Sequence, residues 1–191
     1  MNKMVSVEEA ASQVKVVAIR LALMHLAYAR TLAEELDGDQ AKDIIIKAMM
    51  TYGQMIGERN KKGEQDLPYY GMHEKYSYKE QEFLDTRDMP SDQSGEMDFD
   101  SFKVYGCVLS QIFREYDEAE LGSLYCFVDA AKTMAAESTH KLIHTACVVC
   151  GDDHCAFKSV PTTVAELRMF EERNSDWKNV DPVLVKKCNN K

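Results

Sequence analysis

The feature that most constrains this chain is a tight turn that joins two short segments of strand character. A Gly-Asp-Asp sequence at 151–153 separates residues 140–150 from residues 155–160, and glycine beside aspartate is a common hairpin signal. Cys147 and Cys155 stand almost symmetrically about the turn, so we expect them to be neighbours on adjacent strands. Such thiols are nucleophiles or metal ligands when accessible and small hydrophobes when buried.

The N-terminal third has the periodicity of two amphipathic helices. Residues 7–36 repeat apolar or aromatic side chains at steps of three and four. These side chains are Val14, Val17, Leu21, Met24 and Tyr28. A second helix is expected over residues 40–61, with an inner stripe of Ile45, Met49, Tyr52 and Ile56.

Glycines mark two places where these helices need a special backbone. Gly38 is expected to take the left-handed conformation that ends the first helix, and a flanking aspartate to cap the second. Gly53 and Gly57 lie one turn apart in the second helix. Because glycine lowers helix propensity, this pair predicts the close approach of another element or of a ligand.

Beyond the helices the pattern changes to short strands and short helices. We expect a strand at 102–107, helices over 109–116 and 121–134, the hairpin, and a last helix over 162–173. Because helices come first and strands later, the sequence predicts an α+β fold. In it, N-terminal helices pack on an antiparallel sheet that includes a C-terminal β-hairpin.

One domain is expected over residues 1–191, since a chain of 191 residues that is 45% hydrophobic suits a single core. It divides into a helical part (1–62), a long loop or lid (63–98), an α/β part with the hairpin (99–175) and a tail (176–191). A loop of more than about 15 residues is usually functional or disordered.

Charge and hydropathy exclude several classes of partner. The chain has 32 acidic and 23 basic residues and a formal net charge of -9, so its average surface repels nucleic acid and anionic membranes. No uninterrupted apolar run reaches the roughly 20 residues of a membrane helix, and the first residues lack the apolar stretch of a secretion signal. We therefore predict a cytoplasmic protein whose six cysteines stay reduced.

Four motifs resemble the L-2-amino-thiazoline-4-carboxylic acid hydrolase family. The most specific is Gly-Asp-Asp-His-Cys-Ala-Phe at 151–157, which follows Leu-Gly-Ser-Leu-Tyr-Cys-Phe-Val-Asp at 121–129. Residues 52–59 are similar to the second helix of the family, and residues 104–107 to its first strand cysteine. The hairpin also resembles the vinyl-4-reductase domain of small-molecule sensors. The resemblance therefore implies a vinyl-4-reductase-like, ligand-binding fold.

The resemblance implies an enzyme that opens a small heterocycle containing sulfur and nitrogen by hydrolysis. Such a reaction needs a nucleophile, a proton donor for the leaving group and a group that stabilises developing charge. The positions that match the family are Cys107, Cys126 and Asp129. Cys126 and Asp129 are three residues apart and share one face of a helix. We assign Cys126 as nucleophile or water-positioning group and Asp129 as acid or base.

A second interpretation of Cys126 stays open. A carboxylate raises the pKa of a neighbouring thiol, and no histidine is adjacent in sequence to activate it. Unless the fold brings His140, His144 or His154 close, Cys126 is an inert core thiol.

Three residues are candidates for contacts with the substrate. Arg59, at the end of the second helix, can bind a substrate carboxylate through its planar guanidinium group. Tyr52 lies on the same helix, and His73 lies in the long loop. A solvent-exposed position is the alternative for Arg59 and His73.

A metal centre is the competing site. Some vinyl-4-reductase sensor domains hold zinc through three cysteines and an acidic residue, and the resemblance places Cys126, Cys147 and Cys155 at the cysteine positions. His144 stands at the acidic position and is an acceptable zinc ligand. It is three residues from Cys147, so a β-bulge is needed to bring both to one side. Cys150 is an alternative ligand.

Two classes of function remain. One is a hydrolase of a cyclic amino-acid derivative, and the other is a non-catalytic small-ligand or zinc-binding domain. Both imply a small-molecule partner rather than nucleic acid or a membrane. The amphipathic segment from Val14 to Tyr28 also allows a homo-oligomer that forms through the N-terminal helices.

Overall fold

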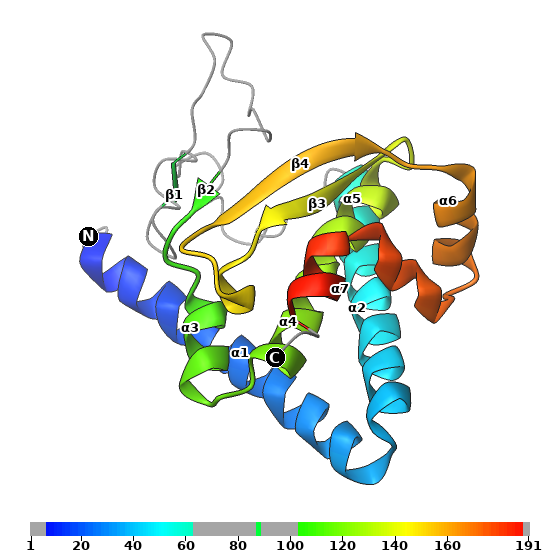
Figure 1. Ribbon diagram of the computed structural model, residues 1–191. Coiled ribbons are helices and arrows are strands. Elements are labelled where there is room, and N and C mark those ends of the chain that lie inside the picture. The colour runs from blue at the N-terminus through cyan, green and yellow to red at the C-terminus, as the bar shows by residue number, and fades with distance from the viewer. Residues whose placement is uncertain (1–6, 63–86, 89–102, 189–191) are drawn as a thin grey trace, which may run out of the picture.

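The computed structural model describes residues 7–62, 87–88 and 103–188. It begins with two long helices, α1 (Val7–Glu35) and α2 (Gly38–Lys61), which diverge from a sharp turn in Figure 1. Asp37 separates them, because its backbone is extended and its Oδ1 accepts a hydrogen bond from the Gln40 amide at 3.0 Å. Gly38 is the first residue of α2. The expectation of a left-handed glycine there was wrong, since the aspartate cap alone ends one helix and begins the next.

The buried face of α1 is made largely of small side chains. Ala18, Ala22, Leu26 and Ala29 are buried, and they pack against α3 (Val108–Glu115) and α4 (Ala119–Ser123). Alanine lets the helices approach closely. The periodic stripe from Val14 to Tyr28 therefore lies beside the buried face and is largely exposed.

Helix α1 is also the most apolar long helix in the described part of the chain. By length and composition, Ser12–Glu35 qualifies as a membrane-crossing segment, with a mean hydropathy of 1.4 in its best window. Arg20 and Arg30 lie within this segment. Core helices and signal sequences pass the same test, so the finding is a weak indication.

Helix α2 packs most extensively against α5 (Val128–Ala136). A Cβ atom built on Gly53 would lie 2.3 Å from the Cβ of Ala131, and one built on Gly57 would lie 2.5 Å from the Cβ of Ala135. The predicted close approach at this glycine pair is confirmed, and its partner is a helix.

Between α4 and α5 the chain continues as a turn of 3-10 helix, η2 (Leu124–Phe127). This tighter segment confirms the expected helical stretch and carries Cys126. The elements that follow are β3 (His140–Ala146), η3 (Val148–Cys150), β4 (Cys155–Pro161), α6 (Val164–Glu171), η4 (Ser175–Val180) and α7 (Pro182–Cys188).

An antiparallel sheet covers α5 (Figure 1). Its strand order is β1-β2-β4-β3, with two-residue strands β1 (Arg87–Asp88) and β2 (Lys103–Val104) at one side of the β3–β4 hairpin. The α+β fold class is thereby confirmed. Strand β1 falls inside the stretch predicted to be a loop, and the rest of that stretch lies outside the described residues.

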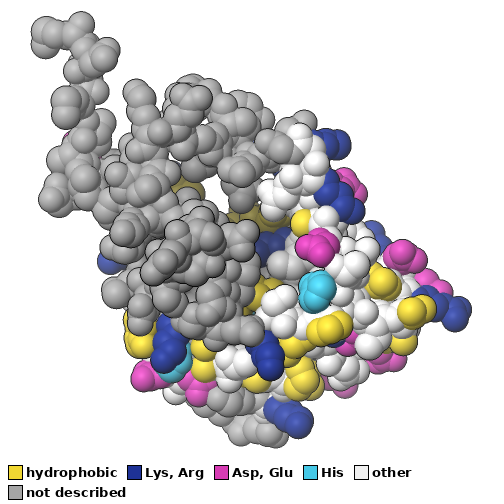
Figure 2. All heavy atoms as spheres, turned by 90° about the horizontal axis from the view of Figure 1, so that it is seen from above, with side chains coloured by type: hydrophobic (Ala, Val, Ile, Leu, Met, Phe, Trp, Pro, Cys, Tyr) yellow, Lys and Arg dark blue, Asp and Glu magenta, His cyan; other side chains and the backbone are white. Residues whose placement is uncertain are grey.

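The segment expected to be a tail after residue 175 is instead folded onto the domain. Trp177, in η4, is fully buried and contacts the rings of Phe127 and Phe170, while α7 packs against β3. The expectation was wrong because the sequence pattern showed no helix after residue 173. The structure has the buried Trp177 and the capped helix α7 beyond that point. On the face seen in Figure 2, acidic and basic side chains are interspersed.

The α2–α5 contact predicts opposite effects for two glycine substitutions. Gly53→Ala should lower the free energy of unfolding by about 1–3 kcal/mol, because the added methyl group meets Ala131 and the α5 backbone. Gly38→Ala is the matched control, since nothing lies within 4 Å of its Cβ position. It should leave stability unchanged or raise it by up to about 1 kcal/mol. Urea unfolding measures both; equal stabilities would contradict the packing described.

Candidate functional site

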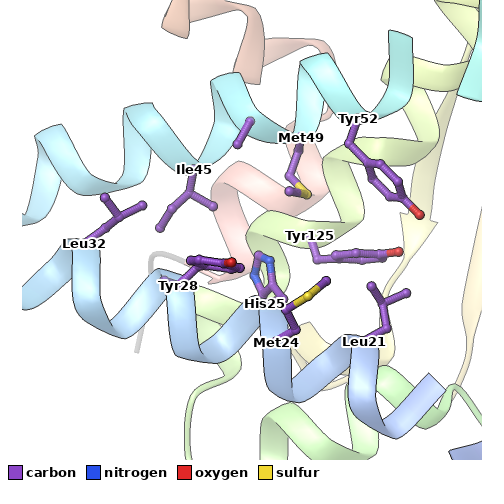
Figure 3. A pocket seen from close by; sticks show the side chains of 11 residues that line it. Leu21, Met24, His25, Tyr28, Leu32, Ile45, Met49, Tyr52 and Tyr125 are labelled. Carbon is purple, nitrogen blue, oxygen red and sulfur yellow. The ribbon is translucent and has the colours of Figure 1, made fainter. Parts of the chain in front are cut away.

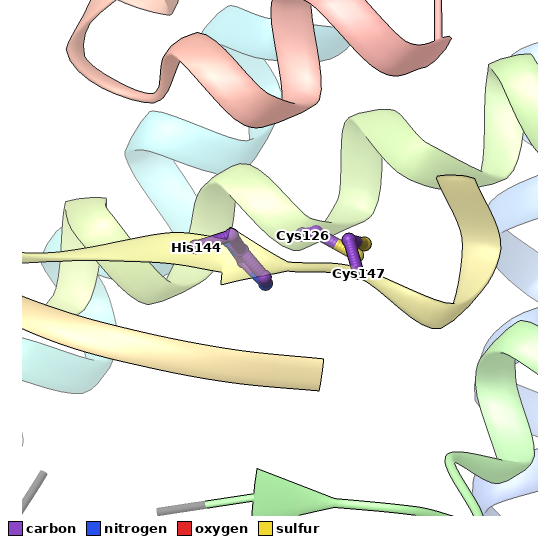
Figure 4. Close-up of side chains that lie close together, drawn as sticks. All are labelled: Cys126, His144 and Cys147. Carbon is purple, nitrogen blue, oxygen red and sulfur yellow. The ribbon is translucent and has the colours of Figure 1, made fainter. Parts of the chain in front are cut away.

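Three side chains from separate segments meet beneath the sheet. The Sγ atoms of Cys126 and Cys147 and a ring nitrogen of His144 all lie within 4.8 Å of one another (Figure 4). Cys126 comes from η2, His144 from β3, and Cys147 from the residue after β3 ends. Both His144 and Cys147 are buried. The fold therefore assembles a thiol–imidazole centre, which we call the Cys126–His144–Cys147 centre.

A β-bulge brings His144 and Cys147 to the same side. His144 pairs with Phe157, but the next pair along the ladder is Ala146 with Ala156, so the register shifts between these two pairs. One extra residue in β3 reverses the alternation of its side chains. The bulge that the metal hypothesis requires is present.

The carboxylate of Asp181 fixes the imidazole of His144. Oδ2 of Asp181 accepts a hydrogen bond from the His144 backbone amide at 2.9 Å and lies 2.8 Å from Nδ1 of its ring. Both residues are almost fully buried, with 2% and 1% of their surfaces exposed. With Nδ1 engaged by a carboxylate, Nε2 is the nitrogen left for a proton or a metal.

Sequence reasoning missed Asp181. Its Oδ1 accepts a hydrogen bond from the Leu184 amide at 3.2 Å, which is the bond of a helix N-cap, and Pro182 is the first residue of α7. An Asp-Pro pair at a helix start was a usable signal for the helix. No local sequence signal shows that Oδ2 of Asp181 contacts His144, which is 37 residues away.

Asp129 approaches the centre from α5. Its Oδ2 lies 3.8 Å from Nε2 of His144, and its Oδ1 accepts a hydrogen bond from Lys132 Nζ at 2.6 Å. The lysine offsets the charge that the carboxylate brings to a region of buried thiols. Asp129 thus lies near the centre, and Lys132 of the same helix holds its side chain in place.

The thiols extend beyond the three-residue centre. Cys147 makes side-chain hydrogen bonds with both Cys126 and Cys155, and the Val148 amide donates to Sγ of Cys155 at 3.3 Å. Cys107, at the start of α3, is close enough to Cys126 for their charges to interact. These four cysteines are free thiols.

Burial and mutual contact keep the thiols protonated. The hydrogen bond with Cys126 and then burial raise the pKa of Cys147 far above its ordinary value. The hydrogen bond with Cys147 and then burial do the same to the pKa of Cys155. For Cys126 the bond from Cys147 lowers the pKa, but burial and the charges of neighbouring groups outweigh it and the net shift is upward. A base or a metal is therefore needed to generate a thiolate here.

Cys150 differs from these four cysteines because it is disulfide-bonded. The expectation that all six cysteines stay reduced was wrong at this position. Cys150 ends η3, and η3 packs against α7. Its sulfur is consequently not available as the alternative metal ligand.

Asp152 and Gly151 shape the turn beside the centre. Gly151 has a φ of 105°, the left-handed conformation that favours glycine. Oδ2 of Asp152 accepts a hydrogen bond from the Cys147 amide at 2.7 Å. The turn residues thus position Cys147 through its backbone, as their structural role predicted.

The other predicted residues lie elsewhere. Tyr52 lines a pocket between α1 and α2, and Arg59 lies in the last turn of α2. His73 is outside the described residues. His154 contacts the ring of Tyr105 and His140 is exposed, so His144 is the histidine that the fold brings to Cys126.

That pocket has a volume of about 370 Å³ and lies between α1 and α2 (Figure 3). It is lined by apolar side chains of α1 and α2, by His25 of α1 and by Tyr125 of η2. Nε2 of His25 lies 2.9 Å from the carbonyl oxygen of Leu121. Burial raises the pKa of Tyr125, and its hydroxyl pairs with that of Tyr52. His25, Tyr52 and Tyr125 therefore already have hydrogen-bond partners.

The raised thiol pKa values predict a stability that depends on pH. Unfolded thiols ionise near pH 8.5, whereas Cys147 and Cys155 stay protonated in the folded protein. Their contribution is fully present below about pH 8.5 and is lost as the pH rises toward the folded-state values. Between about pH 8.5 and pH 9.5, the free energy of unfolding should fall by about 1 kcal/mol for each buried thiol.

Urea unfolding in the presence of a metal chelator measures this effect. The double variant Cys147→Ala, Cys155→Ala is the control and should lose most of the dependence. A wild-type stability that does not change over this range would show that these thiols titrate normally.

Comparison with known proteins supplies the family. The sequence model of the L-2-amino-thiazoline-4-carboxylic acid hydrolase family matches residues 18–158, which include Cys126, His144 and Cys147 but not Asp181. Searches of curated proteins and of solved structures found no match, so the likeness to vinyl-4-reductase domains stays a prediction. Because the match spans well over half of the sequence, the chain belongs to the L-2-amino-thiazoline-4-carboxylic acid hydrolase family.

Proposed function

We propose that the protein hydrolyses a small cyclic amino-acid derivative by opening its ring at a carbon bonded to sulfur and nitrogen. The observation that carries this proposal is the arrangement of Asp181, His144 and Cys126 in space. The carboxylate of Asp181 holds the imidazole of His144, which lies beside the thiol of Cys126. A nucleophile, a base and a group that orients the base are the parts of a covalent hydrolase site. The family to which the chain belongs is named for a reaction of this class.

His144 supplies what the thiol lacks. The pKa of Cys126 is raised, so the thiol is a poor nucleophile alone. Nε2 of His144 can take the thiol proton, and Asp181 stabilises the imidazolium through Nδ1. The separation of up to 4.8 Å between thiol and ring nitrogen exceeds a hydrogen bond, and such contacts commonly shorten when substrate binds.

The expected steps follow from these positions. Sγ of Cys126 attacks the ring carbon as its proton moves to His144, the ring carbon–sulfur bond breaks, and the leaving sulfur takes that proton. Water then attacks the same carbon as His144 takes one of its protons, the bond from this carbon to Sγ of Cys126 breaks, and the proton returns to Sγ. Asp129, 3.8 Å from Nε2, supports the positive charge that His144 carries between the two proton transfers.

Activity measurements on 2-aminothiazoline-4-carboxylate and its ring analogues test the proposal. Cys126→Ser and His144→Gln should each lower kcat/KM by about 1,000-fold or more, because each removes one partner of the proton transfer. His140→Gln is the matched control, since His140 lies on the same strand and is exposed. It should leave kcat/KM unchanged.

Asp129→Asn should lower activity less than His144→Gln, because it removes charge support and not the base. Full activity in a folded Cys126→Ser or His144→Gln variant would contradict the assignment. Circular dichroism spectra of all variants confirm that they are folded.

Zinc binding is the second candidate function, and a specific geometry favours it. The Cys126–His144–Cys147 centre offers three donors, with Cys155 next to Cys147 as a fourth. Donor atoms around tetrahedral zinc lie about 3.5–3.8 Å apart, so separations of up to 4.8 Å need only a small contraction. Asp181 behind His144 is the carboxylate that typically supports a histidine ligand.

Metal analysis separates the two functions. Stoichiometric zinc that is lost in Cys147→Ser or His144→Gln, with no hydrolysis by either form, would establish the binding function. Chelator-treated protein that still opens the ring would establish thiol catalysis. Metal uptake by the site should also release protons, because the thiols are protonated before it.

A further inference from the structure

The pocket between α1 and α2 is separate from the Cys126–His144–Cys147 centre. None of the three centre residues lines it, although Tyr125, which does, directly precedes Cys126 in the chain. Its volume is about 370 Å³, and small-molecule sites in proteins range from about 300 to 1,000 Å³. The hydrolysis proposed for the centre does not use this pocket.

The pocket runs along the facing sides of the two long helices. Its lining residues recur at helical spacing from Leu21 to Leu32 on α1 and from Ile45 to Tyr52 on α2. Figure 3 shows these side chains pointing from the two helices toward one another. The stretch of α1 covers about 16 Å of helix. The pocket is therefore long enough for a molecule of two or three linked rings.

The pocket offers no charge to a ligand. Among the described residues that line it there is no Asp, Glu, Lys or Arg. His25 is 7% exposed, and burial lowers its pKa by more than the hydrogen bond to the Leu121 carbonyl raises it, so the imidazole stays neutral at neutral pH. A charged ligand would lose its hydration here without gaining an opposite charge. The occupant that fits is uncharged.

The inner polar atoms of the lining are already engaged within the protein. Nε2 of His25 lies 2.9 Å from the carbonyl oxygen of Leu121, and the hydroxyl of Tyr125 pairs with that of Tyr52. A polar ligand would have to replace these hydrogen bonds to gain its own, which brings little net free energy. Binding in this pocket therefore depends on apolar and aromatic contacts.

Aromatic rings make up much of the lining. The ring centroids of His25 and Tyr125 are 5.5 Å apart with the planes at 82°, and those of Tyr52 and Tyr125 are 6.3 Å apart at 49°. Tyr28 supplies a further ring and is 69% exposed. Aromatic pairs favour such edge-to-face and tilted contacts, so the ring of a ligand can join this set. The two methionines of the lining adapt to its shape.

We propose that the pocket between α1 and α2 binds an uncharged aromatic molecule of two or three rings. The rings of this ligand pack among the side chains of His25, Tyr28, Tyr52 and Tyr125. A straight aliphatic chain fits less well, because it loses rotational freedom on binding and makes no ring–ring contacts. The site is independent of the hydrolysis proposed for the centre.

Fluorescence of N-phenylnaphthylamine tests the proposal, because this uncharged dye brightens in apolar surroundings. Titration with the full chain should give a Kd of about 10 µM. Ala48→Trp should weaken binding by about 100-fold or more, since Ala48 lines the pocket from an exposed position and the indole would fill it. Ala27→Trp is the matched control, because Ala27 is exposed on α1 and does not line the pocket. It should bind the dye like wild type.

Tyr28→Ala provides a second variant should Ala48→Trp fail to fold. It removes an exposed ring and should weaken binding by about 10-fold. Absence of binding at about 100 µM wild-type protein, or equal binding by the two tryptophan variants, would overturn the proposal.

Competition for the dye tests the class of ligand. Naphthalene should displace it, whereas naphthalenesulfonate and decanol at the same concentration should not. Equal displacement by decanol would overturn the aromatic class and assign the pocket to aliphatic chains. Equal displacement by naphthalenesulfonate would overturn the inference that the occupant is uncharged.

Discussion

The hydrogen bonds of the Asp181 carboxylate are the constraint on which the site depends. One oxygen caps α7, and the other holds both the backbone and the ring of His144. The same carboxylate therefore attaches the C-terminal helix to β3 and aims the imidazole at the thiols. A buried carboxylate is costly unless its oxygens have partners, and three partners satisfy this one. The hydrolysis and the zinc binding that we propose would both use Nε2 of His144, the ring nitrogen that Asp181 does not hold.

Local patterns predicted much of the framework. The bounds of the two long helices follow from periodicity and from the Asp37 cap, and the Gly53–Gly57 pair predicted the close contact with α5. The spacing between His144 and Cys147 indicated that only a bulge could bring both side chains to one side, and a register shift lies between them. These features depend on residues within a few positions of one another, where sequence spacing translates directly into geometry.

The remainder depends on contacts between distant segments. Periodicity alone does not tell which apolar stripe of α1 is inside, and small alanines occupy the inner face because α3 and α4 approach closely there. The helix after Asp181 was missed because its short apolar run is too brief to show a period. The pairing of Asp181 with His144 is tertiary, as is the disulfide at Cys150. Rules based on local sequence cannot predict the Asp181–His144 pair or the disulfide.

The tautomer of His144 tests most directly whether Asp181 controls the centre. Ring-nitrogen chemical shifts from a ¹⁵N-histidine sample, assigned with the His144→Gln variant, distinguish the two neutral forms. We expect the proton on Nδ1 and a bare Nε2 in the metal-free protein, because Oδ2 of Asp181 lies 2.8 Å from Nδ1. A His144 ring that carries its proton on Nε2 would contradict both the base and the metal-ligand roles.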